Sequence, residues 1–215
     1  MKVAVLDLGL GNLMSMKRGL ERAGADVSLV NSDEGPEMGS CGTCCISGCA
    51  DADAVVMPGV GSFKDGMKAI SKFTATLNEI KEGKAALLGV CLGMQMLFSR
   101  SQEGGECEGL GLIKGKVVRL PMTVKVPHMG WNSISLISGN HRLTRGIKDG
   151  EYFYFVHSYY CVPEDRNTVS AEVEYGVKMP AIVEKGNVFG TQFHPEKSGP
   201  AGLAVLKNFL EEAKR

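Results

Sequence analysis

The stretch from Ala85 to Phe98 constrains the fold more than any other part of the chain. Its first half, Ala85 to Val90, is a short apolar run that suits a strand buried on both faces. Its second half has apolar residues from Leu92 to Leu97 at a spacing that suits one face of a helix. Between the two lies Gly89-Val-Cys-Leu-Gly93, a G-x-nucleophile-x-G motif with cysteine as the nucleophile. The stretch therefore predicts a sharp strand-to-helix turn with Cys91 at its tip.

Such a turn favours a reactive cysteine. Its two glycines leave room for the chain to turn sharply, which exposes the sulfur at the edge of the sheet. The N-terminal end of the following helix carries partial positive charge and favours thiolate over thiol. The alternative is an inert cysteine in a glycine-flanked turn, because cysteine is among the most frequently buried residues. A base, an orienting acid and an oxyanion hole elsewhere in the chain would decide for the nucleophile.

The composition excludes several kinds of partner. The chain has 215 residues, with 24 Lys and Arg against 24 Asp and Glu, so its formal net charge is zero. This balance indicates neither a nucleic acid nor a membrane surface as partner. The apolar runs are too short to cross a membrane, and the acid at position 7 argues against a signal peptide. We therefore expect a cytoplasmic protein, with one domain over residues 1–215.

Strands and helices alternate in the first half of the chain, whereas strands dominate the second half. The first half predicts strands at 2–8, 26–30, 54–57 and 85–90, with helices up to 23, at 64–71 and at 75–84. The second half predicts strands at 116–120, 131–137, 152–156, 169–175, 181–184 and 188–192, and a final amphipathic helix at 201–214. This order indicates an α/β fold with a single open, mostly parallel central sheet, flanked by helices and extended by antiparallel strands.

Residues 31–50 are rich in Gly, Ser and Cys. Four of the seven cysteines fall here, at Cys41, Cys44, Cys45 and Cys49, and their C-x2-C spacing permits a zinc or iron–sulfur site. No histidine lies nearby, and no second pair follows at the spacing of a zinc finger. We therefore expect an exposed loop without a metal, and the cysteines do not resemble a secreted disulfide framework. Elemental analysis of the purified protein tests this expectation.

Two further segments suit a catalytic centre around Cys91. In Pro58-Gly-Val-Gly61 the glycines on either side of Val60 free the backbone to turn its N–H groups into a cavity. An ordinary turn between strand and helix is the alternative for this segment. In His194-Pro-Glu196 the proline favours an extended backbone, which would project both titratable side chains to the same side. The carboxylate would then hold one ring nitrogen while the other faces the thiol, although a solvated turn with an unrelated histidine is the alternative.

Six segments, spread over nearly the whole chain, match one known family. They are Asp7-x-Gly-x-Gly-Asn-Leu13, Pro58-Gly-Val-Gly-Ser-Phe63, Gly89-Val-Cys-Leu-Gly-Met-Gln95, Pro127-His-Met-Gly-Trp-Asn132, Tyr154-Phe-Val-His-Ser-Tyr159 and Gln192-Phe-His-Pro-Glu-Lys197. Together they resemble the class I, or triad, glutamine amidotransferases, and within this class the glutaminase subunits of imidazole glycerol phosphate synthase. The fourth segment is the most specific, because other glutaminases of the class lack it. The cysteine-rich segment is longer than the family usually shows.

The resemblance implies a flavodoxin-like fold and hydrolysis of L-glutamine to glutamate and ammonia, with no cofactor. Its Cys-His-Glu triad would consist of Cys91, His194 and Glu196, and the backbone N–H groups of Val60 and Leu92 would form the oxyanion hole. The family-matched positions that would help to bind glutamine are Gly59, Gly61, Gln95, His157, Ser158 and Tyr159.

The resemblance also implies a separate partner that uses the ammonia. This partner would be a (β/α)8-barrel cyclase, which makes imidazole glycerol phosphate and an aminoimidazole carboxamide ribotide in L-histidine biosynthesis. The two would form a heterodimer with an ammonia channel, and the lone glutaminase would be nearly inactive until the Pro58–Gly61 loop is re-aimed. Positions implied to face the partner are Asn12, Arg18, Trp131, Tyr154, near the ammonia path, and Lys197. For Trp131, a place in the core is the alternative.

Three other functions fit the motif around Cys91. A glutaminase subunit of another synthase, such as that of pyridoxal phosphate, is disfavoured by the segment from Pro127 to Asn132. A cysteine peptidase or γ-glutamyl hydrolase of related fold would act without a partner, which a substrate panel on the lone chain would reveal. A non-catalytic binding module would have an unreactive Cys91, which a glutamine-like electrophile such as diazo-oxo-norleucine would leave unlabelled.

Overall fold

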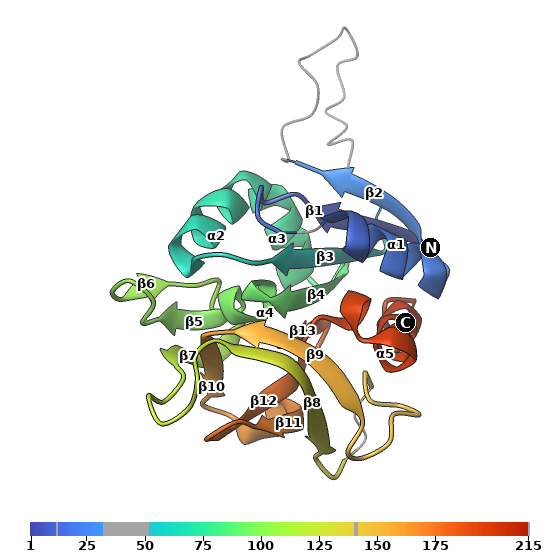
Figure 1. The fold of residues 1–215 in the computed structure, drawn as a ribbon. Helices are drawn as coiled ribbons and strands as arrows, with labels where there is room; N and C mark the ends of the chain where they lie inside the picture. Colours follow the sequence, from blue (N-terminus) through green and yellow to red (C-terminus); the bar gives the residue numbers. More distant parts are fainter. Residues whose placement is uncertain (12, 32–51, 140–141, 215) are drawn as a thin grey trace, which may run out of the picture.

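The computed structural model describes residues 1–11, 13–31, 52–139 and 142–214. Strands and helices alternate along the first part of the chain, and strands dominate from there to a last helix (Figure 1). The elements, including three short 3-10 helices named η, are β1 (Lys2–Leu6), α1 (Leu13–Ala23), β2 (Asp26–Val30), β3 (Ala54–Gly59), α2 (Phe63–Ile70), η1 (Ser71–Phe73), α3 (Thr74–Lys81), β4 (Ala86–Cys91), α4 (Leu92–Met96), β5 (Phe98–Ser101), β6 (Cys107–Glu108), β7 (Ile113–Arg119), β8 (His128–Leu136), β9 (Tyr152–His157), β10 (Tyr159–Pro163), η2 (Arg166–Thr168), β11 (Val169–Glu174), β12 (Lys178–Lys185), β13 (Val188–Thr191), η3 (Pro195–Lys197) and α5 (Gly199–Glu212).

A nine-stranded sheet in the order β2-β1-β3-β4-β13-β12-β11-β8-β9 forms the centre of the molecule. From β2 to β13 neighbouring strands pair in parallel. From β13 to β9 they pair antiparallel. The expected α/β fold, with a parallel central sheet and an antiparallel extension, is therefore confirmed.

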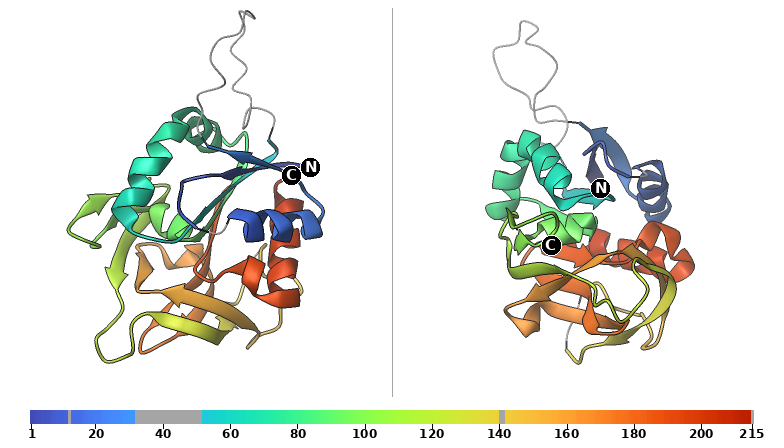
Figure 2. Two further views of the ribbon diagram at one scale, coloured as in Figure 1. Left: turned by 45° about the horizontal axis from the view of Figure 1, so that its top comes forward. Right: turned by 60° about the vertical axis from the view of Figure 1, so that its left-hand side comes forward.

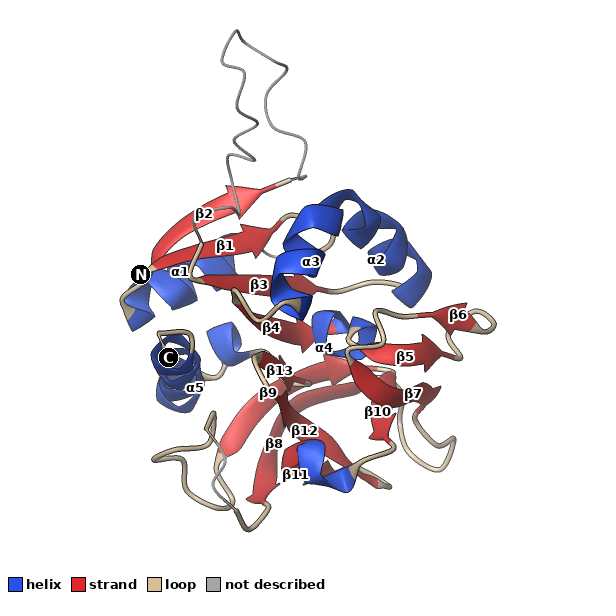
Figure 3. Ribbon diagram, turned by 180° about the vertical axis from the view of Figure 1, so that it is seen from behind, coloured by secondary structure: helices blue, strands red, loops and turns tan. Residues whose placement is uncertain are grey.

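Helices cover both faces of the parallel half. Because successive side chains of a strand point to opposite faces, Val3 and Val5 of β1 pack toward α1 and α5, whereas Ala4 and Leu6 pack toward α2, α3 and α4. Figure 3 shows the two groups of helices on opposite sides of the strands, and the right-hand view of Figure 2 again shows α1 beside α5. Burial on both faces explains why these strands are short, continuous apolar runs in the sequence.

A second, four-stranded sheet in the order β10-β7-β5-β6 was not expected. The strand predicted at 116–120 belongs to this sheet, where it pairs with β10 and β5. Ile113, Val117 and Cys161 of this sheet join the apolar cluster that also contains α2 and α4. The sheet therefore lies beside the helix that follows Cys91, on one face of the central sheet (Figure 1).

Two local expectations were wrong. The helix after Cys91 ends at Met96, and β5 begins only two residues later, so α4 is much shorter than the apolar spacing suggested. All five residues of α4 are buried, because it packs against the sheet on one side and α2 on the other. The strand expected at 181–184 begins earlier, at Lys178, so Pro180 lies inside β12. The register between β12 and β11 is irregular between residues 169 and 172 of β11, which accommodates this proline.

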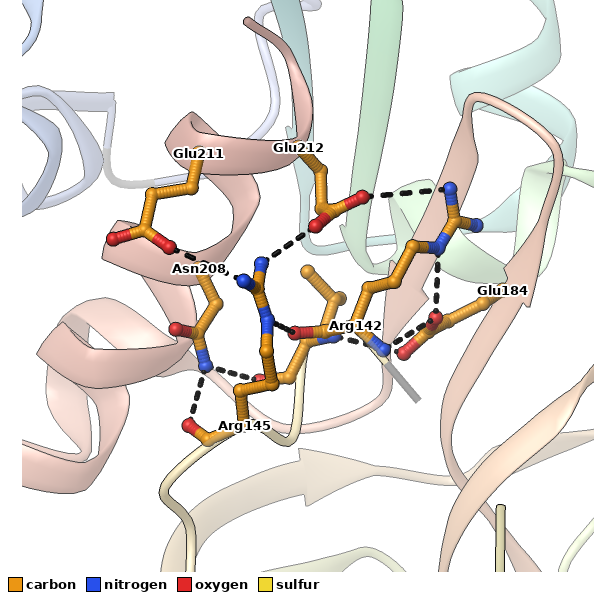
Figure 4. A network of polar contacts seen from close by, with 7 residues as sticks. Arg142, Arg145, Glu184, Asn208, Glu211 and Glu212 are labelled. Atoms are coloured by element: carbon orange, nitrogen blue, oxygen red, sulfur yellow. Dashed lines mark hydrogen bonds and ion pairs between the residues drawn. The ribbon is translucent and has the colours of Figure 1, made fainter. Parts of the chain in front are cut away.

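A network of ion pairs anchors the segment from Arg142 to Arg145, which follows β8, to β12 and α5 (Figure 4). Arg142 contacts Glu184, which also accepts hydrogen bonds from the backbone N–H groups of residues 142 and 143. Asn208 donates to the carbonyl groups of residues 143 and 145, both at 2.8 Å. These contacts tie the end of the antiparallel extension to the last helix.

No helix among the described residues is long and apolar enough to cross a membrane. The parallel strands β3 and β4 end side by side, since Gly59 pairs with Cys91, and β13 ends beside them at Thr191. The carboxyl ends of parallel strands are where open α/β sheets bind their ligands. The fold thus places the elbow cysteine at the edge where a site is expected.

Candidate active site

Cys91 is the last residue of β4 and immediately precedes α4. Its φ of 54° and ψ of −105° make it the one non-glycine residue with positive φ among those that the structure describes. Such a backbone conformation costs about 1–3 kcal/mol and persists only where the surrounding structure enforces it. The sharp turn predicted from the sequence is therefore present, and its backbone strain lies at the cysteine itself.

The two glycines of the elbow are required by close backbone contacts. A Cβ on Gly89 would lie 2.6 Å from the carbonyl carbon of Gly93, and a Cβ on Gly93 would overlap with the carbonyl oxygen of Met57. Larger residues at either position would push α4 away from the ends of β3 and β4. The glycines thus fix how closely Cys91 approaches the sheet.

His194 and Glu196 form a buried hydrogen-bonded pair, with Nδ1 of the ring 2.8 Å from Oε1 of the carboxylate. The expected extended backbone is wrong, because Pro195 to Lys197 form a turn of 3-10 helix and only His194 is extended. The turn still brings the carboxylate behind the ring. The backbone N–H of His194 also donates to the carbonyl of Tyr154, which ties the histidine to β9.

The environment of His194 favours a charged ring. Burial alone would lower its pKa, but interactions with the Cys91 sulfur and the Glu196 carboxylate outweigh burial and raise the pKa to about 9. The Nε2 atom is buried and makes no hydrogen bond of good geometry to the described residues. The Cys91 side chain is thus near enough to influence the ring, and the second ring nitrogen is free for a reacting group.

A cavity of about 260 Å³ opens beside Cys91. Among the residues predicted to act in catalysis or to bind glutamine, those that line this cavity are Val60, Gly61, Cys91, Leu92, Gln95, His157, Ser158 and Tyr159. Gly59 does not line it; a Cβ there would lie 3.2 Å from the Leu92 side chain, so this glycine allows close packing of β3 against α4. His194 and Glu196 are buried outside the lining.

Three further residues that the sequence did not indicate also line the cavity: Glu103, Pro127 and Val156. Glu103 accepts a hydrogen bond of 2.8 Å from the backbone N–H of Phe63, the first residue of α2. A carboxylate is stable at this helix end because of the unpaired N–H groups and the partial positive charge there. No local sequence signal marks Glu103, because it lies in the loop between β5 and β6, 40 residues beyond the helix that it contacts.

Two buried amide side chains, of Gln95 in the cavity lining and of Gln192 outside it, form a chain of hydrogen bonds to the sulfur. Gln95 donates to the Tyr159 carbonyl at 2.9 Å and to Oε1 of Gln192 at 3.3 Å. Gln192 in turn donates from Nε2 to the Cys91 sulfur at 3.7 Å. The Cys91 thiol lies 3.5 Å from the Val156 carbonyl, to which it donates. Gln192 is the first residue of the family-matched segment that ends at Lys197, and the sequence indicated no role for it.

Two buried imidazoles form a second chain that ends at the same Tyr159 carbonyl. Nδ1 of His157 lies 2.9 Å from this carbonyl, and Nε2 of His157 lies 3.0 Å from Nδ1 of His128. Asn132 contacts the remaining nitrogen of His128 at 3.3 Å. Burial lowers the pKa of His128 to about 4 and that of His157 to about 3, so both rings are neutral near pH 7.

The positions expected to face a partner are partly brought together. Trp131 is 57% exposed on β8, so a place in the core is excluded. Its ring lies 6.2 Å from that of Tyr154 on β9, and Nζ of Lys197 lies 5.7 Å from the Tyr154 ring. Arg18 is exposed on α1, whereas Asn12 lies outside the described residues.

Within the described ranges, no group of three or more His, Cys, Asp or Glu side chains is arranged to hold a metal ion. Residues 41–49, with four cysteines in the segment considered for a metal, lie outside those ranges. The absence of a metal at that segment therefore stays a prediction.

Known glutamine amidotransferases match this sequence over nearly its whole length. The family model described as glutamine amidotransferase class-I matches residues 4–213. Imidazole glycerol phosphate synthase subunit HisH of Halobacterium salinarum is 50% identical, with 97% of this chain and 92% of that protein covered. The HisH subunit of Methanosarcina acetivorans is 46% identical, with 98% of each chain covered.

Solved structures support the fold. A structure titled as a glutamine amidotransferase has a TM-score of 0.72 at 22% identity, and the match covers 99% of both chains. A structure of PurLQS from Thermotoga maritima matches with the same TM-score and identity, over 98% of this chain and 97% of that one. At this identity the likeness concerns the fold, while the family rests on the sequence matches. The chain belongs to the class I glutamine amidotransferases and, within them, to the HisH subunits of imidazole glycerol phosphate synthase.

Proposed function

We propose that the chain is the glutaminase subunit of imidazole glycerol phosphate synthase, that Cys91, His194 and Glu196 are its catalytic residues, and that it passes ammonia to a (β/α)8-barrel cyclase. One observation carries the assignment of the site: a strained, cavity-lining Cys91 lies near a histidine whose far nitrogen is held at 2.8 Å by a buried carboxylate. This arrangement suits nucleophilic attack on an amide carbon.

In the first half of the reaction, the Cys91 thiolate attacks the side-chain amide carbon of glutamine and forms a carbon–sulfur bond. The carbon–nitrogen bond then breaks, and the imidazolium of His194 gives its proton to the departing ammonia. A pKa raised to about 9 keeps this ring protonated at neutral pH, as the step requires. Glu196 is the positioning residue that holds the ring and stabilises its charge.

In the second half, neutral His194 accepts a proton from water, whose oxygen attacks the glutamyl thioester. The carbon–sulfur bond breaks, glutamate leaves, and the sulfur and the ring return to thiolate and imidazolium. In both halves, a negative oxygen develops on the substrate carbon. Leu92 and Val60 line the cavity. Their backbone N–H groups are the proposed donors to this oxygen, each worth about 3 kcal/mol of the barrier.

The cavity lining suits an amino acid. Glu103 lines the cavity with its position fixed by α2, and a carboxylate is the natural partner of an α-ammonium group. Gln95 already uses both N–H bonds of its amide, so it can offer only its oxygen to a ligand. We therefore assign Gln95 as an acceptor in glutamine binding and retain Gly59, Gly61, His157, Ser158 and Tyr159 as the expected surroundings of the substrate.

The surface formed by β8 and β9 suits a protein partner. Met129, Trp131 and Tyr152 are exposed on it, and Trp131 pairs with Tyr154 across the two strands. A cluster of exposed aromatic and Met side chains is typical of the centre of an interface. We propose that the cyclase docks here and also contacts Lys197 and Arg18. Asn12, which lies outside the described residues, stays a partner-facing position expected from the sequence.

Co-purification with the cyclase is the test. The expected result is a complex that forms glutamate from glutamine, faster when the ribotide ligand of the cyclase is present, and that loses this activity in Cys91→Ala. Cys107→Ala, at a partly exposed cysteine away from the cavity, is the matched control and should retain it. Glutamine hydrolysis that survives Cys91→Ala would refute the mechanism.

Two further measurements separate the alternatives. Rapid peptide or γ-glutamyl cleavage by the lone chain would favour a hydrolase that needs no partner. Absence of an adduct at Cys91 after treatment with diazo-oxo-norleucine would favour a binding module. The cytoplasm stays the proposed compartment, and fractionation of cells that produce the protein would test it.

A further inference from the structure

The amide of Gln192 lies directly behind the nucleophile, although the proposed reaction gives it no role. Its side chain is fully buried at the end of β13, and Nε2 lies 3.7 Å from the Cys91 sulfur. A fully buried amide would be costly without partners, so its contacts are part of what the fold requires. Its orientation decides whether the sulfur meets an N–H donor or an oxygen.

The neighbouring residues fix that orientation. The Tyr159 carbonyl can only accept a hydrogen bond, so the Gln95 atom 2.9 Å away must be the amide nitrogen. This nitrogen also lies 3.3 Å from the Gln192 side chain, so the Gln192 atom facing it must be the oxygen. The nitrogen of Gln192 is therefore the atom turned toward the sulfur.

The same carbonyl also fixes the direction of the hydrogen bonds that run through His157 and His128. It accepts from Nδ1 of His157 at 2.9 Å, so both of its acceptor positions are occupied. Neutral His157 then accepts at Nε2 from His128. Gln95 donates one N–H to the Tyr159 carbonyl and the other to the Gln192 oxygen, so neither amide can turn over without breaking at least one buried hydrogen bond.

We propose that Gln192 is a further catalytic residue, which donates a hydrogen bond to the Cys91 thiolate. The Val156 carbonyl, 3.5 Å from the sulfur, stabilises the thiol, since it can only accept a hydrogen bond. The Gln192 N–H stabilises the thiolate instead, because it interacts more strongly with a negative sulfur than with a neutral one. It acts again when the thioester breaks and the sulfur regains its negative charge.

This inference rests on the proposed function, but its test does not require glutamine. The rate of alkylation at Cys91 by iodoacetamide, followed by mass spectrometry of the peptide that contains Cys91, measures the thiolate in the full-length chain. Gln192→Met keeps the length of the side chain and removes the donor. Thr191→Val, at the neighbouring buried residue that does not contact the sulfur, is the matched control.

We expect Gln192→Met to react about threefold more slowly at neutral pH. Loss of about 1.4 kcal/mol of thiolate stabilisation lowers the thiolate fraction about tenfold, and the less stabilised thiolate is about threefold more reactive. In alkaline solution, where both thiols are ionised, it should react at least as fast as the wild type, because a less stabilised thiolate is the better nucleophile. A packing defect would not produce this reversal with pH. Thr191→Val should follow the wild type at every pH.

Gln95→Met provides a second variant in case Gln192→Met does not fold. It removes the group that orients Gln192, so a smaller slowing in the same direction is expected. Equal rates at neutral pH in the wild type and a folded Gln192→Met would overturn this inference alone. A wild-type Cys91 that reacts no faster than free cysteine would overturn the proposed function as well.

Discussion

The buried imidazole pair of His128 and His157 makes the stability of the folded chain sensitive to acid. Both residues are at least 95% buried, and burial lowers their pKa values to about 4 and about 3. In the unfolded chain each would titrate near pH 6.5. Below this pH the unfolded state binds protons at these two rings and the folded state does not, so the free energy of unfolding falls as the pH falls.

The magnitude follows from these pKa values. Well below pH 6.5 each histidine costs about 1.4 kcal/mol per pH unit. Because an unfolded histidine is only half protonated at pH 6.5, the loss between pH 6.5 and about pH 4.5 is about 2 kcal/mol each and about 4 kcal/mol for the pair. The loss continues until the pH reaches the folded-state pKa values. His194 has the opposite sign: its pKa is raised to about 9, so its contribution is fully present below about pH 6.5 and is lost as the pH rises through about 9.

Urea denaturation at the two pH values measures the effect. The variant with His128→Gln and His157→Gln cannot titrate at these positions, so the difference in unfolding free energy between it and the wild type should change by about 4 kcal/mol between the two pH values. His128→Gln alone should account for about half of this change. If the difference between wild type and variant is the same at both pH values, the rings are not held neutral by burial and the reasoning is refuted.

Three substitutions test the elbow, the triad and the network of Figure 4. Gly93→Ala places a methyl group against a backbone carbonyl of β3 and should lower the free energy of unfolding, measured in a thermal melt, by about 3 kcal/mol or more. In the control Gly83→Ala the methyl group meets open space, and the loss should be about 1 kcal/mol. Equal losses in the two variants would contradict the steric argument. Glu196→Gln keeps the shape of the side chain but removes the charge behind His194, so glutamate formation by the complex with the cyclase should fall about 100-fold or more, and a fall below threefold would count against the triad. Asn208→Leu removes two hydrogen bonds to backbone carbonyls and should lower the free energy of unfolding in urea by about 2 kcal/mol. An unchanged urea midpoint would show that these hydrogen bonds are dispensable.

Local patterns were sufficient for the parts of the fold that local sterics decide. The strands of the parallel half are apolar runs because they are buried on both faces, and the elbow at Cys91 is recognisable because only glycine fits at positions 89 and 93. The contact between His194 and Glu196 was predictable because the two residues are close in sequence. The backbone that produces it was not, because the choice between an extended segment and a turn depends on how η3 packs against its neighbours.

Elements that exist only through pairing with another segment were not predictable in the same way. β5 has only four residues, and β6 has two, so neither has a pattern long enough to indicate a strand. β5 becomes a strand because it pairs with β7, and β6 because it pairs with β5. Glu103 was missed for the same reason, since it acquires a position in the cavity through a hydrogen bond to α2.

The unexpected sheet and the unexpected polar chains have one structural cause. Tyr159 opens β10, and its pairing with Arg119 of β7 holds the backbone of residue 159 in place. The carbonyl of Tyr159 is the acceptor that orients Gln95 and fixes the tautomer of His157. A sequence that does not reveal the pairing of β10 with β7 therefore cannot reveal which atom of Gln192 faces the nucleophile. The second sheet does more than cover one face of the fold, because it sets the direction of the hydrogen bonds that reach the sulfur.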